Sequence, residues 1–245
     1  MHRVGRGLPR LFTTNPKTPY ELESVPNLPF EFGGAAIARG SLRVGRPGRV
    51  RVKTPVENAC SFVHVMLHEG VPGHLFQMHT ADESASVSAF RRDWGGVLAY
   101  VEGWAEYASD LSDDLGLGHQ DFVRTERIVG KVFMAARAAV DTGIHWHGWS
   151  AERGAAFYRE SAPWAPQAVV EGVVQRALAN AGMQSAYMIG QQKMLALRTE
   201  ATRDLGPRFN IKSFHDQVLQ NGALPLGVLE QHIHDWVANE KRRPE

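Results

Sequence analysis

The segment His68–Gln77, HEGVPGHLFQ, combines the residue types that bind and use a catalytic zinc ion. Histidine nitrogens are zinc ligands, and a neighbouring glutamate can act as a general base. The helical motif HExxH places its histidines four residues apart, whereas His68 and His74 are six apart. On a regular helix they would lie about 120° apart around the axis. The two rings can converge only if the backbone departs from a regular helix between Gly70 and Gly73, where glycine and proline permit it.

His64 offers a competing pair, because His64 and His68 are four residues apart and share one helix face. In that pair the glutamate follows the second histidine, which departs from the order in HExxH. The sequence favours His68 with His74, and His64 with His68 stays the alternative.

A catalytic zinc site usually has three protein ligands and an open position, so a third ligand is needed. The segment YVEGWAEYASD supplies Glu102 and Glu106, one turn apart on an amphipathic helix. Either carboxylate could face the histidines, or both could be solvated. Glu102 is favoured because it adjoins Gly103 and Trp104 and follows the apolar run GGVLAYV. Two imidazoles and a carboxylate suit zinc, and also suit iron or manganese.

The helix that carries His68 is predicted from residues at its two ends. Thr54 can act as N-cap, Pro55 suits the first helical position, Glu57 completes a capping box, and Gly70 offers a stop. Further helices are predicted at about 83–92, 97–115, 120–142, 150–160, 165–180, 183–205, 213–220 and 225–238, with Ser213 capping the short one and Pro225 opening the last.

The first 54 or so residues are predicted to be extended. Pro and Gly recur in TTNPKTPYELESVPNLPFEFGG, and Val alternates with Arg around a turn in SLRVGRPGRVRVKT. We therefore expect a mainly α-helical fold in a single domain, 1–245. A strand-rich segment at 1–54, with a short β-hairpin or small sheet, would precede a helical metal-binding core at 55–240.

Composition excludes several classes of protein. The chain has 245 residues, 43% of them hydrophobic, and a formal net charge of +1, so it can bury a core but carries no basic surface for nucleic acid or a membrane. Its single cysteine, Cys60, excludes an internal disulfide framework and is predicted to be a buried core residue. No apolar run is long enough to cross a membrane, and no signal peptide is evident, so we expect a cytoplasmic location.

Five ordered motifs resemble a bacterial family known as domain of unknown function 885. They are HEGVPGHLFQ, EGWAEYA, ARAAVDTGIHWHGWS, QSAYMIGQQKMLALR and FHDQVLQNGALPLGVLEQHI, between about Arg46 and Ala238. Members of this family look like gluzincin metallopeptidases, which implies a helical gluzincin-like metallohydrolase fold. The resemblance implies that His68, His74 and Glu102 are the zinc ligands and that Glu69 is the general base.

The same motifs suggest supporting residues. Asp141 could orient a ligand histidine, and His145 could hydrogen-bond the developing oxyanion. Tyr187 matches a tyrosine of the family and could also donate to the oxyanion. Arg137 and Arg176 match family arginines and could bind a substrate carboxylate. For each of these residues a structural role is an open alternative.

The chain departs from the family pattern away from the metal motif. The motif ExxRYxxxPGQA reads VVQRALANAGMQSA, in which Val173 stands in place of the glutamate and Ala177 in place of the tyrosine. Family members are usually about twice as long, so the chain resembles only their C-terminal catalytic half. A homodimer or a partner subunit could replace the other half.

The predicted function is zinc-dependent hydrolysis of a peptide or amide bond in a small substrate. A metalloenzyme of specialised metabolism that acts on a small peptide-like or non-protein intermediate is a close variant. A metal-stabilised binding module without turnover is the alternative of another class, although it would have no need of Glu69 as a base.

Overall fold

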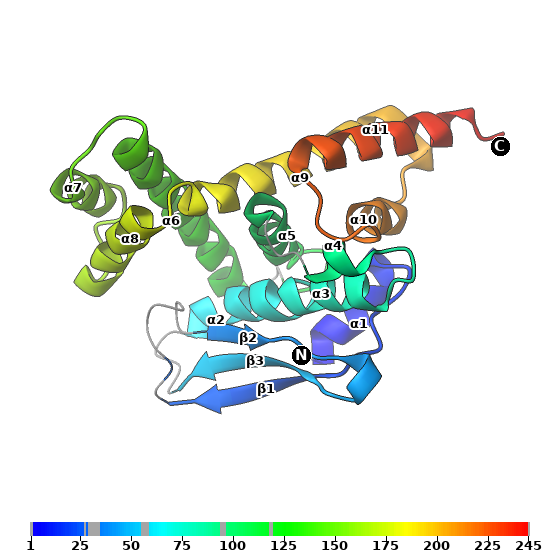
Figure 1. Cartoon of the computed structure of the whole chain (residues 1–245), viewed down its shortest axis with the longest axis horizontal. Coiled ribbons are helices and arrows are strands. Elements are labelled where there is room, and N and C mark those ends of the chain that lie inside the picture. Colours follow the sequence, from blue (N-terminus) through cyan, green and yellow to red (C-terminus); the bar gives the residue numbers. More distant parts are fainter. Residues whose placement is uncertain are drawn as a thin grey trace.

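The computed structural model describes residues 2–26, 28, 35–54, 59–93, 97–117 and 120–244, a few of them by their backbone alone. It is mainly helical, with one small sheet near the N-terminus, as predicted (Figure 1). The helices before the centre of the chain are α1 (His2–Leu11), α2 (Ala59–Val65), α3 (His74–Glu83), α4 (Ala89–Asp93) and α5 (Leu98–Asp110). Those that follow are α6 (Asp121–His145), α7 (Ala151–Ser161), α8 (Gln167–Ala179), α9 (Met183–Leu205), α10 (Ile211–Leu219) and α11 (Leu226–Arg242).

The sheet has the strand order β1-β3-β2, from β1 (Tyr20–Val25), β2 (Ala35–Ala38) and β3 (Gly48–Lys53). The central strand β3 pairs parallel to β1 and antiparallel to β2. Residues of β3 alternate between buried and half-buried, as expected of a strand with one face on the core. Val50 and Val52 on the buried face pack against Met66 and Leu75, so the sheet supports the segment on either side of the HEGVPGH motif.

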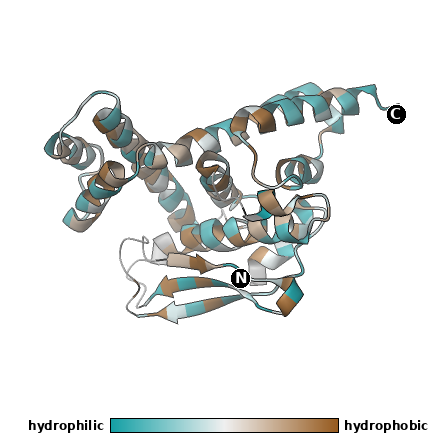
Figure 2. Ribbon diagram, in the orientation of Figure 1, coloured by the Kyte–Doolittle hydropathy of each residue, from teal (hydrophilic) through white to brown (hydrophobic). Residues whose placement is uncertain are grey.

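Helix α5 lies at the centre of the main hydrophobic core. Its residues Tyr100, Trp104 and Tyr107 are fully buried and pack against α9, α10, α11 and the N-terminal helix. Figure 2 shows hydrophobic positions of α5 enclosed by helices with hydrophilic outer faces. A second core cluster joins α6, α7 and α8, which form a lobe at the left of Figure 1. The HEGVPGH motif therefore lies between the sheet and helix α5.

The close approach of α5 and α9 depends on two glycines. A Cβ on Gly103 would lie 2.4 Å from the Cα of Gly190, and a Cβ on Gly190 would lie 1.7 Å from the carbonyl oxygen of Ala99. Neither position tolerates a side chain without moving a helix. This contact brings Tyr187, one turn before Gly190, close to Glu102.

The prediction for the N-terminal segment was partly wrong. The chain begins with helix α1, in which Val4, Leu8 and Leu11 recur at helical spacing and are buried in the main core. Burial of these side chains against distant segments thus outweighs the low helix propensity of the glycines in this stretch. A hairpin does form, because β2 and β3 pair antiparallel and the Ser41–Arg46 bridge continues their register. Its turn is a 3-10 turn, η2 (Leu42–Val44), and only the second half of SLRVGRPGRVRVKT is a strand.

Several helices differ from the prediction: α4 begins at Ala89 and not near 83, and α5 ends at Asp110 and not near 115. The sequence missed helix α3, because His74 to Glu83 has no cap or clear apolar periodicity. Helix α10 begins at Ile211, and Asn210 rather than Ser213 caps it by accepting from the backbone N–H groups of Lys212 and Ser213. Pro225 does precede the last helix. Pro55, Glu57 and the side chain of Cys60 lie outside the described residues.

Candidate metal centre

His68 and Glu69 lie in a π-helical turn, η3 (Met66–Gly70), that continues directly from α2. Such single wide turns occur often at functional sites. The prediction that regular helix stops by Gly70 is therefore confirmed, and the departure begins four residues earlier than expected. The wide turn changes the direction in which the His68 and Glu69 side chains project.

The chain then reverses tightly so that His74 returns to His68. The Val71–Pro72 peptide bond is cis, and α3 begins at His74. A Cβ on Gly73 would lie 1.8 Å from the carbonyl oxygen of His68, so only glycine fits at this position. The rings of His68 and His74 are consequently in contact edge to face, with centroids 4.8 Å apart.

Helix α5 holds this reversal and supplies the third group of the cluster. The Trp104 indole donates from Nε1 to the carbonyl oxygen of Pro72 over 2.9 Å. Two residues earlier on α5, Glu102 Oε2 lies 3.4 Å from His68 Nε2 and 3.3 Å from His74 Nε2. The two motifs HEGVPGH and EGWA thus meet in space at the three residues that the resemblance indicated.

These three residues fit a divalent metal ion. Glu102 Oε2 is buried and accepts no hydrogen bond, although two imidazole nitrogens face it. Each residue offers one ligand atom, and the three atoms lie within 4.8 Å of one another. Zinc–ligand distances of about 2.0–2.2 Å in tetrahedral geometry put ligand atoms roughly 3.3 Å apart. The observed spacing and the nitrogen and oxygen donor set both match that requirement.

Negative charge surrounds His68 in the metal-free chain. Burial alone would lower the pKa of His68, but the carboxylates of Glu102, Glu106 and Glu69 outweigh it and raise that pKa to about 9. Burial would raise the pKa of Glu102, but the two histidines that face its carboxylate hold it well below its usual range. The cluster therefore attracts positive charge.

Glu106 and His64 form a second group with His68, in which Glu106 faces the ring nitrogen opposite the one that faces Glu102. Glu106 Oε1 is 3.6 Å from His68 Nδ1, and its Oε2 is 3.7 Å from His64 Nε2. His64 and His74 thus both approach His68, but at opposite ring nitrogens. The His64 side chain is 30% exposed and the His74 side chain 7%, so the more enclosed set is the one with His74 and Glu102.

The structure does not bring Asp141 to a ligand histidine, so the prediction that it orients one is wrong. Its two carboxylate oxygens accept from the backbone N–H groups of Gly182 and Ser185 and from the Ser185 hydroxyl. Asp141 therefore caps the N-terminus of α9. The carboxylate beside a cluster histidine is Glu106, one turn from Glu102, which helix spacing could have indicated for this purpose.

His145 lies away from the metal cluster. Its Nε2 is 2.8 Å from the carbonyl oxygen of Ala177, and the residue does not line the pocket around His68. The predicted contact with an oxyanion is therefore not supported by its position. His145 instead joins the end of α6 to α8.

The other predicted site residues do line one pocket of about 400 Å³ with the metal cluster. They are Glu69, Tyr187, Arg137 and Arg176. The Tyr187 ring is stacked parallel to that of His68 with centroids 6.2 Å apart, and the Arg137 guanidinium lies 4.8 Å from the Tyr187 ring centroid. Strand β2 closes one wall through Ala35, Ala36 and Ile37, a contribution that the sequence did not indicate.

No described helix is both long and apolar enough to cross a membrane.

No curated protein matches the chain. Solved structures that are similar to this chain include the following two. The crystal structure of "the putative lipoprotein from Colwellia psychrerythraea" is 29% identical with a TM-score of 0.89, over 97% of this chain and 41% of that one. A second, a "putative lipoprotein of unknown function from Shewanella oneidensis", is 22% identical with a TM-score of 0.74, over 94% of this chain and 44% of that one, and shows the fold alone.

The chain therefore spans less than half the length of these solved relatives. Their descriptions as lipoproteins give no support to the predicted cytoplasmic location, which stays a prediction. The sequence profile of a family described as bacterial protein of unknown function (DUF885) matches residues 1–233, nearly the whole chain. With the motifs in order and the helical fold shared, the chain belongs to the bacterial DUF885 family.

Proposed function

We propose that the chain is a zinc-dependent hydrolase of a peptide or amide bond. One observation carries the proposal: two imidazole nitrogens face a buried carboxylate oxygen that has no hydrogen bond, in a pocket that also contains Glu69. Catalytic zinc sites have such a three-ligand set with an open position. A site that only stabilised the fold would not need a pocket beside it.

Each side chain of the pocket has a separate task in this proposal. A bound metal ion would lower the pKa of a water molecule and polarise the scissile carbonyl. Glu69 accepts the proton of the attacking water and returns it to the leaving amine. Tyr187, on the opposite helix and parallel to the His68 ring, donates its phenolic hydrogen to the oxygen that gains negative charge.

The size and charge of the pocket favour a small substrate with a polar or acidic group. About 400 Å³ accommodates a short peptide segment or a small amide, and not a folded polypeptide. Arg137 and Arg176 supply positive charge on the wall next to Tyr187. A carboxylate of the substrate can bind there by charge-assisted hydrogen bonds.

Metal content tests the ligand set. Elemental analysis of untagged protein should find about one zinc per chain, lost in His74→Ala and in Glu102→Ala. His64→Ala is the matched control, because His64 is the competing histidine and should be dispensable. Zinc occupancy unchanged in both ligand variants would exclude the site, and loss only in His64→Ala would favour the alternative pair.

Turnover tests the role of Glu69. In Glu69→Gln the zinc content should be unchanged, while hydrolysis of small peptides and acylated amino acids should fall by about 10²- to 10⁴-fold. Equal rates in the wild type and Glu69→Gln would contradict the proposed base. If the zinc-loaded wild type binds such compounds but never hydrolyses them, the chain is a binding module.

A further inference from the structure

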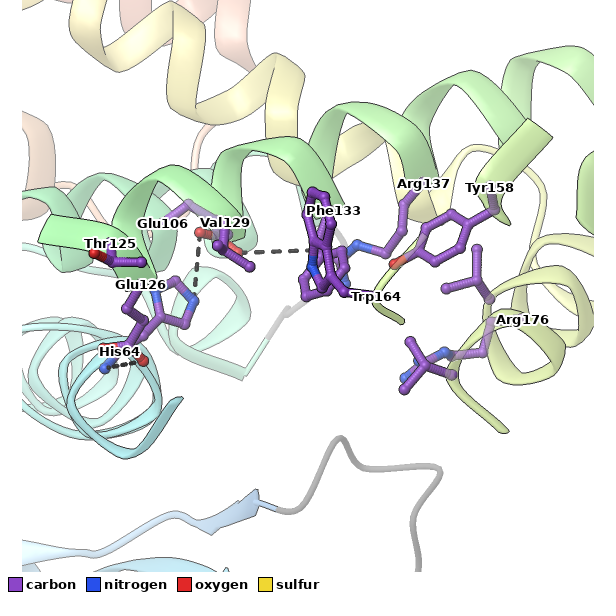
Figure 3. Close-up of a pocket in the computed structure, with 13 residues that line it drawn as sticks. His64, Glu106, Thr125, Glu126, Val129, Phe133, Arg137, Tyr158, Trp164 and Arg176 are labelled. Atoms are coloured by element: carbon purple, nitrogen blue, oxygen red, sulfur yellow. Dashed lines mark hydrogen bonds and ion pairs between the residues drawn. The ribbon is translucent and has the colours of Figure 1, made fainter. Parts of the chain in front are cut away.

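A second pocket, larger than the first, adjoins the metal centre and has no part in the proposed chemistry. Its volume is about 650 Å³. Arg137 and Arg176 line both pockets, so the two cavities meet at these side chains. His64 and Glu106, from the side of His68 opposite the metal ligands, line the second pocket as well (Figure 3). We refer to it as the aromatic pocket.

The wall of the aromatic pocket farther from His64 is apolar. Phe133, Tyr158 and Trp164 come from α6, α7 and the loop before α8, and Val169 and Val173 come from α8. The Phe133 ring is stacked parallel to Tyr158 with centroids 6.2 Å apart, and it lies 6.3 Å from Trp164. Figure 3 shows Phe133 and Trp164 grouped below α6, between His64 and Arg137. Aromatic rings at such distances form a surface on which another flat or branched apolar group can pack.

Charged groups lie where the two pockets meet. The Arg137 guanidinium is 4.0 Å from Glu106 Oε1, and Arg137 Nε is buried with no hydrogen-bond partner. A buried donor without a partner is costly, and a ligand oxygen would satisfy it. A molecule that places a carbonyl or carboxylate oxygen at Arg137 can reach the metal centre on one side and the apolar wall on the other.

We propose that the aromatic pocket is a substrate subsite for an aromatic or large aliphatic side chain, next to the bond that is hydrolysed. This inference rests on the proposed function, because it assigns the side chain of the same substrate. The preferred substrates would be peptides or acylated amino acids with a bulky apolar residue. Small residues such as alanine would leave the apolar wall uncovered and bind more weakly.

Binding of two matched compounds tests the subsite without requiring turnover. The probes are N-acetyl-L-phenylalanine and N-acetyl-L-alanine, titrated calorimetrically into zinc-loaded Glu69→Gln. The phenylalanine compound should bind about 10- to 100-fold more tightly. Equal dissociation constants for the two compounds would overturn the proposal.

A variant that fills the aromatic pocket tests whether the preference for the phenylalanine compound arises there. Gly130 lies on α6 in the pocket wall, and a Cβ there would meet no atom within 4 Å, so Gly130→Phe adds a ring without a backbone clash. Added to Glu69→Gln, it should reduce the preference to less than about threefold. Gly227→Phe is the matched control, because Gly227 is exposed on α11, outside this pocket, and equally free of neighbours. A preference that survives Gly130→Phe would place the apolar contact elsewhere.

A second variant, Trp164→Ala, tests the subsite independently in case Gly130→Phe misfolds. Trp164 is 56% exposed, so Trp164→Ala removes one wall of the pocket with little effect on the core. It should lower the preference for phenylalanine by about tenfold at unchanged zinc content. If hydrolysis is never observed but the binding preference behaves as described, the proposed catalysis fails and the subsite stands. If hydrolysis occurs without any preference between the two side chains, the subsite fails and the catalysis stands.

Discussion

Two buried histidine environments lie on either side of helix α5, and they differ in how their ring nitrogens are satisfied. His215 has no exposed surface, and its Nδ1 and Nε2 each lie 2.8 Å from an oxygen, of Leu11 and Tyr107 respectively. His68 and His74 are similarly buried, yet their Nδ1 atoms have no hydrogen-bond partner among the described residues. A satisfied histidine holds the fold together, and an unsatisfied pair beside a carboxylate is suited to a ligand.

The surroundings of the two sites also shift proton affinity in opposite directions. Burial, together with the nearby positive charge of Arg198, lowers the pKa of His215 to about 3. Three carboxylates raise the pKa of His68 to about 9 despite its burial. The pKa of the same residue type at similar depth is therefore raised in one place and lowered in the other. Neighbouring charge, and not burial, separates the structural histidine from the candidate ligand.

Replacing His215 and His74 in turn should give the largest effects that distinguish the two sites. His215→Ala leaves the Leu11 carbonyl and the Tyr107 hydroxyl without a partner and opens a cavity, so we expect the free energy of unfolding to fall by roughly 3–5 kcal/mol. Zinc content should be unchanged. His74→Ala should do the reverse, with loss of zinc and little change in the stability of the metal-free chain. Chemical denaturation with elemental analysis measures both. A His215→Ala protein as stable as the exposed-site control His234→Ala would remove the distinction.

Acid should destabilise the fold through His215. The folded pKa is about 3 and the unfolded value about 6.5, so below pH 6.5 the unfolded chain gains a proton that the folded chain does not. The contribution of His215 is full above pH 6.5 and is lost at up to about 1.4 kcal/mol per pH unit between about pH 6.5 and 3. Denaturation of the chelator-treated wild type and His215→Gln should show a stability difference that shrinks on acidification. A difference that does not vary with pH would mean that folding leaves the pKa of His215 unshifted.

Replacing either of two buried carboxylates, Glu106 and Asp141, should have a smaller effect, on zinc affinity in one case and on stability in the other. Glu106→Gln should weaken zinc binding by about 10- to 100-fold, the usual effect of removing a carboxylate beside a ligand histidine. Asp141→Asn should leave zinc affinity unchanged and cost about 1–2 kcal/mol of stability, since Asp141 caps α9. Competition with a zinc indicator, together with thermal unfolding, measures the two effects. The reverse pattern would restore the role first predicted for Asp141.

The smallest expected effect is that of replacing Trp104, whose ring contacts residues on both sides of α5. Trp104 contacts His215 edge to face and donates to Pro72 on the metal side. Trp104→Phe keeps an aromatic ring but removes the donor, which should cost about 1 kcal/mol and weaken zinc binding by less than about tenfold. Phe214→Leu is a control in the same core without a contact to Pro72. If zinc affinity is unchanged in Trp104→Phe, the hydrogen bond does not position His74.

The sequence predicted that His68, His74 and Glu102 would come together, because residue type and motif order suffice for this grouping. His68, His74 and Glu102 could be named without knowledge of the path between them. It could not predict the π-helical turn, because a change of one residue per turn leaves no trace in composition. It misassigned Asp141, because a helix cap and a residue that orients a ligand use the same side chain. Which of these two roles Asp141 has depends on where the N-terminus of α9 lies in the fold.

The elements at the two ends of the chain show the same limit. Helix α1 forms because Val4, Leu8 and Leu11 find a core built by segments about 100 to 230 residues later. No local pattern strong enough to outweigh its glycines marks it. The aromatic pocket is another product of tertiary contact, because its rings come from three separate elements. Val173, which stands where the family pattern has a glutamate, lies in this wall, so the departure noted in the sequence makes the pocket more apolar.

The contact between Gly103 and Gly190 sets the width of the metal pocket. Glu102 precedes one glycine, and Tyr187 lies one turn before the other, so the gap between the Glu102 carboxylate and the phenol is fixed by two backbones in direct contact. Selection or engineering can therefore change the lining of the pocket residue by residue, but it cannot widen this gap gradually. Even one methyl group at either glycine would force the two helices apart and move both sides of the pocket together.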